Sequence, residues 1–378
     1  MHLMVRKLLL SAGLLGASLM APQALAETAA ETAETSAANA FEQAYAALQQ
    51  AHQQQLPSHE LRSYAQSAYQ AASAYFGDEH INTAKMKLSF LNVLTPSQHS
   101  SGDFADLATS VLDTYESEYG ADADELIPAL MMVLRTQPVR AHLRKNRALF
   151  ERLIEAAERS PSLSVEQQLR LKIDAATLLL AQGNPASRAL LDFPEQAQQQ
   201  LGASHDLTLL AEFSAARYLE VNQQTRSATD YFEKISQHPF TEQASETQLS
   251  IKYMSHARLV ATYEGIGESD KATKHCLAIA AMGRGIGDEE EPTPIYRVNP
   301  KFPPSMARDG HSGSTVLMFD INKLGMVENI RVEEASHKAW ARAATKALQQ
   351  WRYAPRYVNG ASVDTVNRKV VFDFNIRR

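Results

Sequence analysis

The chain has 378 residues, of which 44% are hydrophobic and 21% are charged, and its formal net charge is −6 at pH 7. These values are those of a globular protein, and the length predicts two or more domains. The single cysteine, Cys276, excludes an internal disulfide, so we expect this side chain to be buried in an oxidising compartment.

Residues 1–26 have the pattern of a cleavable secretory signal. Arg6 and Lys7 precede an apolar run over residues 8–21, and a small-x-small cleavage site follows at residues 24–26. The apolar run is 14 residues long, which is shorter than the roughly 20 residues that a spanning helix needs. We therefore expect cleavage after Ala26, with the mature chain beginning at Glu27, rather than retention as a membrane anchor.

Residues 27–39 are rich in Ala, Glu and Thr and have no apolar period, which predicts a disordered leader. From residue 40 to residue 282 the chain is rich in Ala, Leu and Gln, and Gly, Pro, Ser and Asn interrupt it at short intervals. This pattern is typical of consecutive helices separated by turns. We predict an all-α domain over residues 40–282.

A repeated spacing in this region indicates stacked helix pairs. Offsets of 0, 4, 9 and 13 separate Tyr263, Gly267, Ala272 and Cys276. They resemble the tetratricopeptide (TPR) pattern of an aromatic residue, a turn glycine, a small residue and a packing residue. The same offsets recur in a weaker form at Tyr218, Asn222, Ser227 and Tyr231. We predict a TPR-like helical-repeat domain with a concave, partner-binding surface; the alternative is an irregular helical domain.

Residues 283–295 contain glycines, an acidic run and prolines, which predicts a linker between two domains. The net charge also differs in sign between the parts of the chain on the two sides of this segment. Residues 292–378 carry 14 Lys or Arg against 7 Asp or Glu, whereas residues 27–291 carry 21 against 36. We expect the basic C-terminal part to be attracted to the acidic helical part. Salt should weaken this attraction, because surface charges are screened beyond about 8 Å at physiological ionic strength.

Residues 296–378 predict a small α+β domain with a three-stranded antiparallel sheet and one helix. Alternating apolar residues indicate strands over residues 315–321 and 370–376, and a third strand is expected over residues 326–332 after a turn at Gly325. Residues 338–351 have apolar positions at spacings of three and four, the period of a helix that packs on a sheet. The predicted core consists of Phe319, Trp340, Leu348, Trp351, Phe372 and Phe374. The predicted fold class is thus α+β multidomain, with the all-α helical-repeat domain first.

Several short motifs stand in a fixed order within the C-terminal part of the chain. They are Pro300, Phe302-Pro303, Ala307-Arg308, Gly310, Gly313, Gly325-Met326-Val327, Trp351-Arg352-Tyr353-Ala354-Pro355, Asn359-Gly360 and Val371-Phe372-Asp373-Phe374. Together they resemble the C-terminal domain of the TonB family of energy transducers. The resemblance implies a periplasmic domain that binds an extended peptide, the TonB box of outer-membrane receptors, by adding it as a strand beside its last strand.

The last strand is therefore the expected partner-binding edge, since a free strand edge is a template for an incoming strand. The residues predicted to contact the partner are Arg368, Lys369, Val371, Asp373 and Asn375. Basic residues beside the strand either attract an acidic partner or discourage edge-to-edge aggregation. The alternative is that these residues are only the surface of a small fold. Homodimerisation through this domain is also open.

The sequence contains no recognisable catalytic or metal-binding motif. Its His residues are scattered, and HExxH, paired CxxC and GxSxG patterns do not occur. Cys276 stands at a packing position of the repeat. We expect no enzymatic activity, no cofactor and no metal, and, because the basic domain is exported, no nucleic-acid partner.

Two functions remain. The first is a periplasmic TonB-family protein that is accessory to TonB-dependent transport and binds extended segments of outer-membrane TonB-dependent receptors or other envelope proteins. Inner-membrane motor proteins are further candidate partners. The second is a periplasmic helical-repeat scaffold or assembly factor that uses the domain to bind peptides without energy transduction. Family members that harvest the proton-motive force keep an N-terminal membrane anchor and a proline-rich spacer, and this sequence shows neither pattern.

Overall fold

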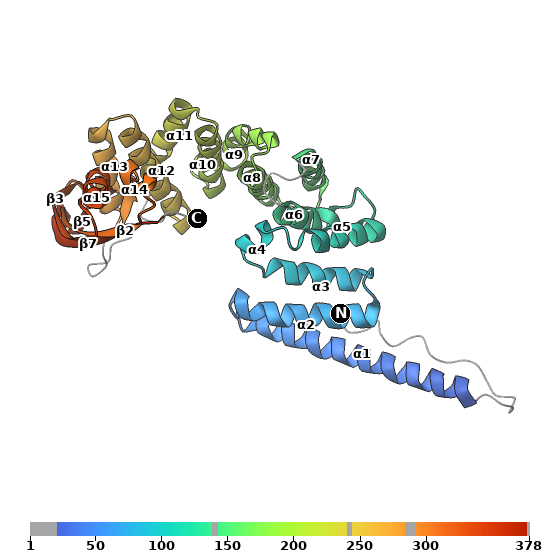
Figure 1. Ribbon diagram of the computed structural model, residues 1–378. Helices are drawn as coiled ribbons and strands as arrows, with labels where there is room; N and C mark the ends of the chain where they lie inside the picture. The colour runs from blue at the N-terminus through green and yellow to red at the C-terminus, as the bar shows by residue number, and fades with distance from the viewer. Residues whose placement is uncertain (1–20, 138–142, 240–243, 284–291, 376–378) are drawn as a thin grey trace. The chain divides into compact units, whose positions relative to one another are not determined.

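The computed structural model describes residues 21–137, 143–239, 244–283 and 292–375, with side chains from residue 34 onward. The chain forms two compact units, Met1–His142 and Leu143–Arg378, and each is described by itself. The N-terminal part is helical and the C-terminal part is an α+β domain, as predicted (Figure 1). Most of the predicted signal segment and of the predicted linker lies outside the described residues.

The first unit is built from helices that each pack on a neighbour (Figure 1). Small side chains make close packing possible: Ala65, Ala68 and Ala72 on one face of the second helix are fully buried. The helices are α1 (Ala21–Gln53), α2 (Ser58–Phe76), α3 (Ile81–Asn92), α4 (Pro96–Ser100), α5 (Ala105–Tyr119), the 3-10 turn η1 (Asp124–Leu126) and α6 (Ile127–Thr136).

Helix α1 runs without a break through residues 27–39, which were expected to form a disordered leader. The composition explains this difference. Ala and Glu are among the best helix formers, so the segment has the propensity for a helix although it lacks the apolar period of a packed one. Cleavage after Ala26 stays a prediction.

The second unit begins with further helix pairs, and side-chain caps fix where several of its helices start. Ser164 and Gln167 form a reciprocal capping box at the start of α8, and Ser245 caps α12. The elements are α7 (Leu143–Arg159), α8 (Val165–Ala181), the 3-10 segment η2 (Pro185–Leu191), α9 (Phe193–Leu201), α10 (Asp206–Val221), α11 (Thr225–Gln237), α12 (Glu246–Gly265) and α13 (Ser269–Ala281).

The pair α12–α13 has the geometry that its spacing predicted. Gly267 lies in the turn with a φ of +80°, a conformation that favours glycine. Tyr263, Ala272 and Cys276 are all buried in one apolar cluster between the helices. The offsets thus correspond to one turn residue and three contacts between the helices of the pair.

The pair α10–α11 repeats this arrangement, but one residue later than expected. Its positive-φ turn residue is Gln223, with a φ of 61°, and not Asn222. The buried residues at the corresponding positions are Leu219, Ala228 and Phe232. The register over Tyr218, Asn222, Ser227 and Tyr231 is therefore wrong by one residue, because half-exposed tyrosines stand directly beside the buried positions and imitate the pattern.

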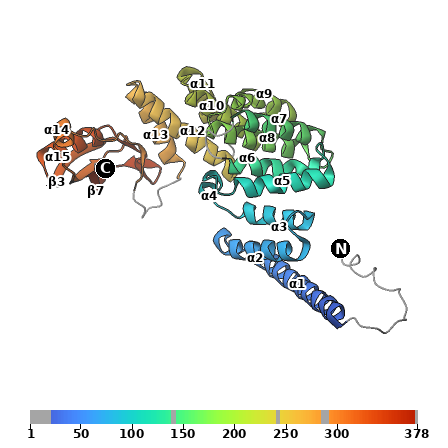
Figure 2. The ribbon, with the colours of Figure 1, turned by 45° about the vertical axis from the view of Figure 1, so that its right-hand side comes forward.

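The C-terminal domain follows the helices. Its elements are β1 (Pro294–Tyr296), α14 (Pro304–Arg308), β2 (Gly313–Ile321), β3 (Val327–Ala335), α15 (Lys338–Leu348), β4 (Arg352–Tyr353), β5 (Arg356–Val358), β6 (Ala361–Val363) and β7 (Thr365–Phe374). The main sheet is antiparallel with the order β3-β2-β7, and α15 contacts β2 and β3 (Figure 2). Two small ribbons, β1–β4 and β5–β6, were not predicted; β1 begins within the range predicted as linker.

One apolar cluster fills the space between α15 and the sheet. All six predicted core residues lie in it, with exposures of 8% or less: Phe319, Trp340, Leu348, Trp351, Phe372 and Phe374. The rings of Trp340 and Phe374 stack with their centroids 4.6 Å apart. Gly313 is required beside them, because a Cβ there would collide with the Trp340 indole.

Candidate functional site

The last strand, β7, lies at an edge of the main sheet. It pairs with β2 from Phe374, opposite Gly313, to Thr365, opposite Ile321. Within the described residues, no segment pairs with its other side. An edge strand presents a row of unpaired N–H and C=O groups, so β7 offers a template for another strand.

The hydrogen bonds of β2 identify the residues of β7 whose backbone groups face this open side. The carbonyl of Ser314 accepts a hydrogen bond from the amide of Ser336, on the β3 side. The backbone groups of the next residue, Thr315, therefore face β7, where its partner is Phe372. Because this direction alternates along antiparallel strands, the residues that flank Phe372 face outward. The outward-facing residues are Lys369, Val371 and Asp373.

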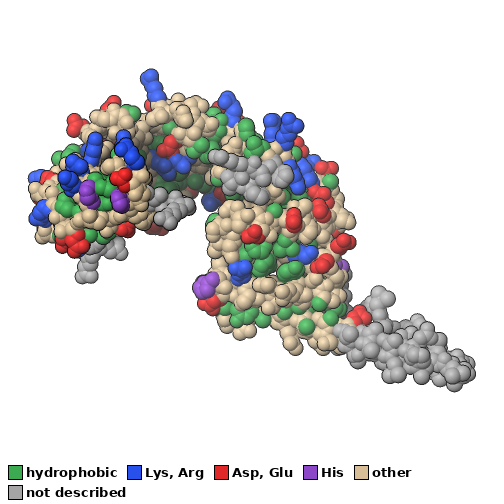
Figure 3. Space-filling view, in the orientation of Figure 1, with side chains coloured by type: hydrophobic (Ala, Val, Ile, Leu, Met, Phe, Trp, Pro, Cys, Tyr) green, Lys and Arg blue, Asp and Glu red, His purple; other side chains and the backbone are tan. Residues whose placement is uncertain are grey.

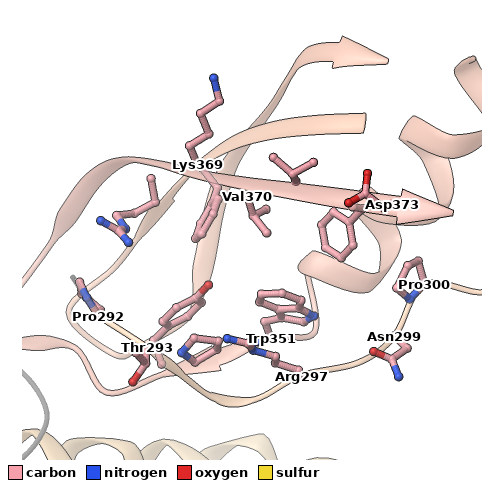
Figure 4. A pocket seen from close by; sticks show the side chains of 15 residues that line it. Pro292, Thr293, Arg297, Asn299, Pro300, Trp351, Lys369, Val370 and Asp373 are labelled. Carbon is pink, nitrogen blue, oxygen red and sulfur yellow. The ribbon is translucent and has the colours of Figure 1, made fainter. Parts of the chain in front are cut away.

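A groove of about 490 Å³ runs along the open edge. Strand β7 forms one wall, and the extended segment over residues 292–300 forms the other (Figure 4). Trp351 lies between the two walls, and its indole Nε1 donates a hydrogen bond to the carbonyl of Val298 over 2.9 Å. The guanidinium of Arg297 lies over the same ring, 5.2 Å from its centroid. Trp351 thus ties the second wall to the sheet.

The groove combines an apolar floor with a mainly basic rim. The apolar and aromatic lining residues include Phe319, Trp351, Tyr353, Val370 and Phe372. The charged lining residues are Arg297, Arg368, Lys369 and Asp373. Blue Lys and Arg side chains are spread over the face of the domain seen in Figure 3. Such a lining suits an extended segment that carries both apolar and acidic side chains.

Two titratable groups of the groove, Tyr353 and Lys369, have raised pKa values. Burial raises the pKa of Tyr353 to about 12, so its hydroxyl keeps its proton. Lys369 donates a hydrogen bond to the carboxylate of Glu333 in β3, over 2.8 Å, which raises the pKa of the Lys369 amine. No change in the charge of these two groups is expected near pH 7.

The five residues predicted for partner binding do not all lie on one face. Lys369, Val371 and Asp373 are exposed and alternate with the buried Phe372 and Phe374. Arg368 is half-buried and lies on the inner face of the sheet with Val370, since side chains alternate along a strand. Arg368, Lys369, Val371 and Asp373 all line the groove. Asn375 is exposed, follows the last residue of β7 and is not part of the lining.

The second wall of the groove was not foreseen as part of a site. No binding role was expected for Arg297, Thr293 or Pro294. A signal was present: Ile295, Tyr296 and Val298 are β-branched or aromatic residues of the kind enriched in strands. Three nearby prolines concealed it.

Bulges in β3 and β7 shape the sheet next to the groove. The register with β2 shifts by one residue at two places in β3 and at one place in β7. One of the two bulges of β3 and the bulge of β7 each contain an asparagine in the left-handed region, Asn329 with a φ of 50° and Asn367 with a φ of 58°. Asp320 of β2 lies between them and accepts a hydrogen bond from each. The bulge at Asn367 immediately precedes the groove-lining residues of β7.

Other classes of site find little support in the part of the chain that the structure describes. No group of three or more His, Cys, Asp or Glu side chains there has a metal-binding arrangement. Burial raises the pKa of Cys276 to about 12, so its thiol is unreactive at neutral pH. None of the described helices combines the length and apolar character that crossing a membrane requires.

Comparison with known proteins places β7, one wall of the groove, within a recognised domain. Residues 298–376 match the family model of the Gram-negative bacterial TonB protein C-terminal. The C-terminal domain is a TonB C-terminal domain. The match covers β7 and the rest of the main sheet, but it begins after β1 and Arg297. These residues of the second wall therefore precede the matched region.

Two curated relatives are named as TonB proteins. The chain is 37% identical over 62 residues to Protein TonB of Xanthomonas campestris pv. campestris strain B100, and equally to that of strain ATCC 33913. The aligned residues are 16% of this chain and 28% of each relative. This protein therefore spans less than a third of the length of these relatives. The TonB match contains none of the helices that precede residue 298.

Proposed function

We propose that this protein binds extended peptide segments of outer-membrane TonB-dependent receptors, or of other envelope proteins, as an added strand on β7. The observation that carries the proposal is the open edge of β7 along a groove in a TonB C-terminal domain. Three outward-facing residues of β7 would supply main-chain hydrogen bonds, and the apolar floor would take side chains of the peptide. The proposed site of action is the periplasm.

The charge of the groove supports a peptide with acidic character. Three basic residues and one acidic residue line it, and Arg297 and Lys369 are exposed. Electrostatic complementarity of this kind mainly raises the association rate and the selectivity. The affinity itself would come from the strand pairing and from apolar burial on Trp351 and Val370.

Proline substitution tests the strand pairing. The amide of Val371 faces the open side, so Val371→Pro removes a hydrogen-bond donor for the guest strand and leaves the hydrogen bonds to β2 in place. We expect at least a tenfold loss of affinity for a fluorescent synthetic peptide that carries the TonB box of a receptor from the same bacterium. Val371→Thr changes the side chain but keeps the amide, and it should bind like the parent. Equal binding by parent and proline variant would show that the edge of β7 is not the site.

The helical part raises a second possibility, a periplasmic scaffold that uses the domain without energy transduction. The helices that precede residue 298 make up most of the chain, and the TonB match contains none of these. Crosslinking in cells followed by purification separates the two functions. Recovery of inner-membrane motor proteins favours a role in energised transport, whereas recovery of envelope proteins without any motor favours the scaffold.

A further inference from the structure

The last helix pair contacts the TonB domain through a buried ion pair. Arg352 of β4 donates a hydrogen bond from Nε to Oε1 of Glu264, near the end of α12, over 2.5 Å. The hydroxyl of Ser269, at the start of α13, donates to the other oxygen of Glu264 over 3.1 Å. The side chains of Arg352 and Glu264 are only 5% and 13% exposed. Because both carboxylate oxygens are engaged, the position of Arg352 relative to the turn of α12–α13 is fixed.

Apolar contacts surround this ion pair. Ile295 and Tyr296 of β1 pack against the buried cluster between the helices. On the other side, Ala354 packs with Ile279 and Ala280 of α13. The helices therefore hold both strands of the β1–β4 ribbon, in which Tyr296 pairs with Arg352.

The same ribbon carries the second wall of the groove. Strand β1 lies within residues 292–300, and Pro294 and Arg297 line the groove opposite β7. In this segment Ile295 thus lies against α12, whereas Pro294 and Arg297 face the groove. Much of it precedes residue 298, where the TonB match begins. The wall is fixed by helices that the family domain does not include.

We infer that the helix pair α12–α13 positions the second wall and so sets the width of the groove, with Glu264 as the positioning residue. The inference rests on the proposed function for the identity of the occupant, but not for the mechanical link. The peptide-binding unit of this protein then extends from α12 to β7. A second consequence is that a guest strand between β7 and the wall would be coupled to the turn of α12–α13.

Hydrogen exchange of the full chain tests the mechanical link without any ligand. In Glu264→Ala the wall loses the ion pair that supports it on α12, and we expect the amides of residues 295–299 to exchange at least tenfold faster than in the parent. Amides of β2 and β7 should keep their parental rates, because the core between α15 and the sheet does not involve Glu264. Equal acceleration in all strands would indicate a general structural role and would overturn the inference.

Two further variants sharpen the comparison. Glu264→Gln keeps an acceptor for Arg352 but loses the charge, so its exchange rates at residues 295–299 should lie between those of the parent and the alanine variant. Glu268→Gln is the matched control: Glu268 lies in the same turn, carries the same charge and pairs with the exposed Lys271 rather than with the TonB domain. It should leave exchange in the wall unchanged. Acceleration by Glu268→Gln as large as by Glu264→Gln would mean that charge in the turn, and not the contact, is responsible.

Binding of the same TonB-box peptide tests the consequence for the groove. We expect Glu264→Ala to weaken binding by about fivefold or more, and Glu268→Gln to leave it unchanged. If the parent itself does not bind the peptide, the proposed function fails while the exchange experiment still decides the link. If the parent binds and Glu264→Ala accelerates exchange without weakening binding, the helices hold the wall but do not set the width of the groove, and the inference is wrong.

Discussion

The carboxylate of Asp320 in β2 accepts a hydrogen bond from the backbone amide of Asn367 in β7 over 2.8 Å. Its second oxygen accepts one from the side-chain amide of Asn329 in β3 over 2.9 Å. A single central side chain thus stabilises a bulge in each neighbouring strand. The hydrogen bond from Asn367, and then that from Asn329, holds the pKa of Asp320 below its usual value of 3.8.

Replacing Asp320 should destabilise the TonB domain. Asp320→Ala removes the acceptor of both bulges, and we expect a loss of about 2 kcal/mol in the free energy of unfolding. Asp320→Asn keeps one acceptor and should lose about half as much. Because the folded-state pKa is lowered, the contribution of Asp320 is present above pH 3.8 and is lost as the pH falls through the folded pKa.

Urea denaturation followed by tryptophan fluorescence measures this effect in the full chain. Both tryptophans of the protein, Trp340 and Trp351, lie in the TonB domain, so the signal reports that domain alone. An alanine variant as stable as the parent would mean that the bulges hold without Asp320.

A second prediction separates two costs of replacing a glycine, the cost of backbone strain and the cost of a steric collision. Gly325 has a φ of +78°, and a Cβ there would collide with the carbonyl of Tyr353. Gly360 has a φ of +81°, but a Cβ there would meet open space. Gly360→Ala should therefore cost about 1 kcal/mol from conformation alone. Gly325→Ala should cost clearly more, about 3 kcal/mol, because Tyr353 must also move.

The same urea titration compares the two glycine variants. The TonB domain of Gly325→Ala should unfold at a distinctly lower urea concentration than that of Gly360→Ala. Similar urea midpoints would show that Tyr353 of β4 can move away from a Cβ at position 325 at little cost. The hydrogen bond from the Tyr353 amide to the Gly325 carbonyl, over 3.0 Å, would then not require this close approach.

The third prediction concerns the core below the groove. Phe372 is 8% exposed, and its ring lies 5.4 Å from that of Trp351 in an edge-to-face arrangement. Phe372→Ala should cost about 3–5 kcal/mol, as large truncations in cores do. Its neighbour Val371 is 54% exposed, so Val371→Ala should change stability by less than about 0.5 kcal/mol. Thermal unfolding of the two variants checks the contrast, and a large cost for Val371→Ala would place that side chain in an unrecognised contact.

The C-terminal domain was predictable because its periods are short and strong. Alternation in β2 and β7 and the helical period of α15 identified the three elements and their buried faces without long-range information. The place of the last strand in the core was equally predictable, since few arrangements of these three elements bury Trp340, Phe372 and Phe374 together. The order β3-β2-β7 then leaves the last strand at the edge.

Long-range relationships could not be predicted in this way. The hydrogen bond from Trp351 to Val298 and the ion pair of Arg352 with Glu264 join residues far apart in the sequence. The local spacing of apolar residues does not indicate such partners, and the sequence does not distinguish a buried arginine from an exposed one. In the helices, the register of α10–α11 was missed by one residue because Tyr218 and Tyr231 lie beside the buried positions, and composition alone favoured disorder where α1 is helical.

A buried chain of polar side chains joins α11, α12 and α13. The Nδ1 atoms of His256 and His275 lie 2.8 Å apart, and Nε2 of His275 lies 3.2 Å from Oε1 of Glu233. Tyr263 donates its hydroxyl proton to the same oxygen over 2.7 Å. Since His275 must donate from Nε2 to the carboxylate, its Nδ1 is the acceptor and His256 is the donor when both rings are neutral.

This arrangement predicts that acid destabilises the helix pairs. Burial, followed by the proximity of His275, lowers the pKa of His256 from 6.5 to about 4, and burial also lowers that of His275. The unfolded chain therefore binds more protons than the folded chain between about pH 6.5 and 4, so stability falls as the pH drops through this window. His256 alone should account for a loss of about 2 kcal/mol between pH 6.5 and 5. Denaturation followed by far-ultraviolet circular dichroism at several pH values measures the loss.

The variant His256→Gln, His275→Gln isolates the histidines from other titrating groups. It should be less stable than the parent at pH 7, because the hydrogen bonds to Glu233 and between the rings are altered. Its stability should nevertheless change much less between pH 6.5 and 5, since no buried imidazole resists protonation. His59 is exposed on α2, so His59→Gln should keep the parental pH dependence. If the double variant also keeps that dependence, groups other than the buried pair cause the loss, and the chain of side chains between α11 and α13 has no part in it.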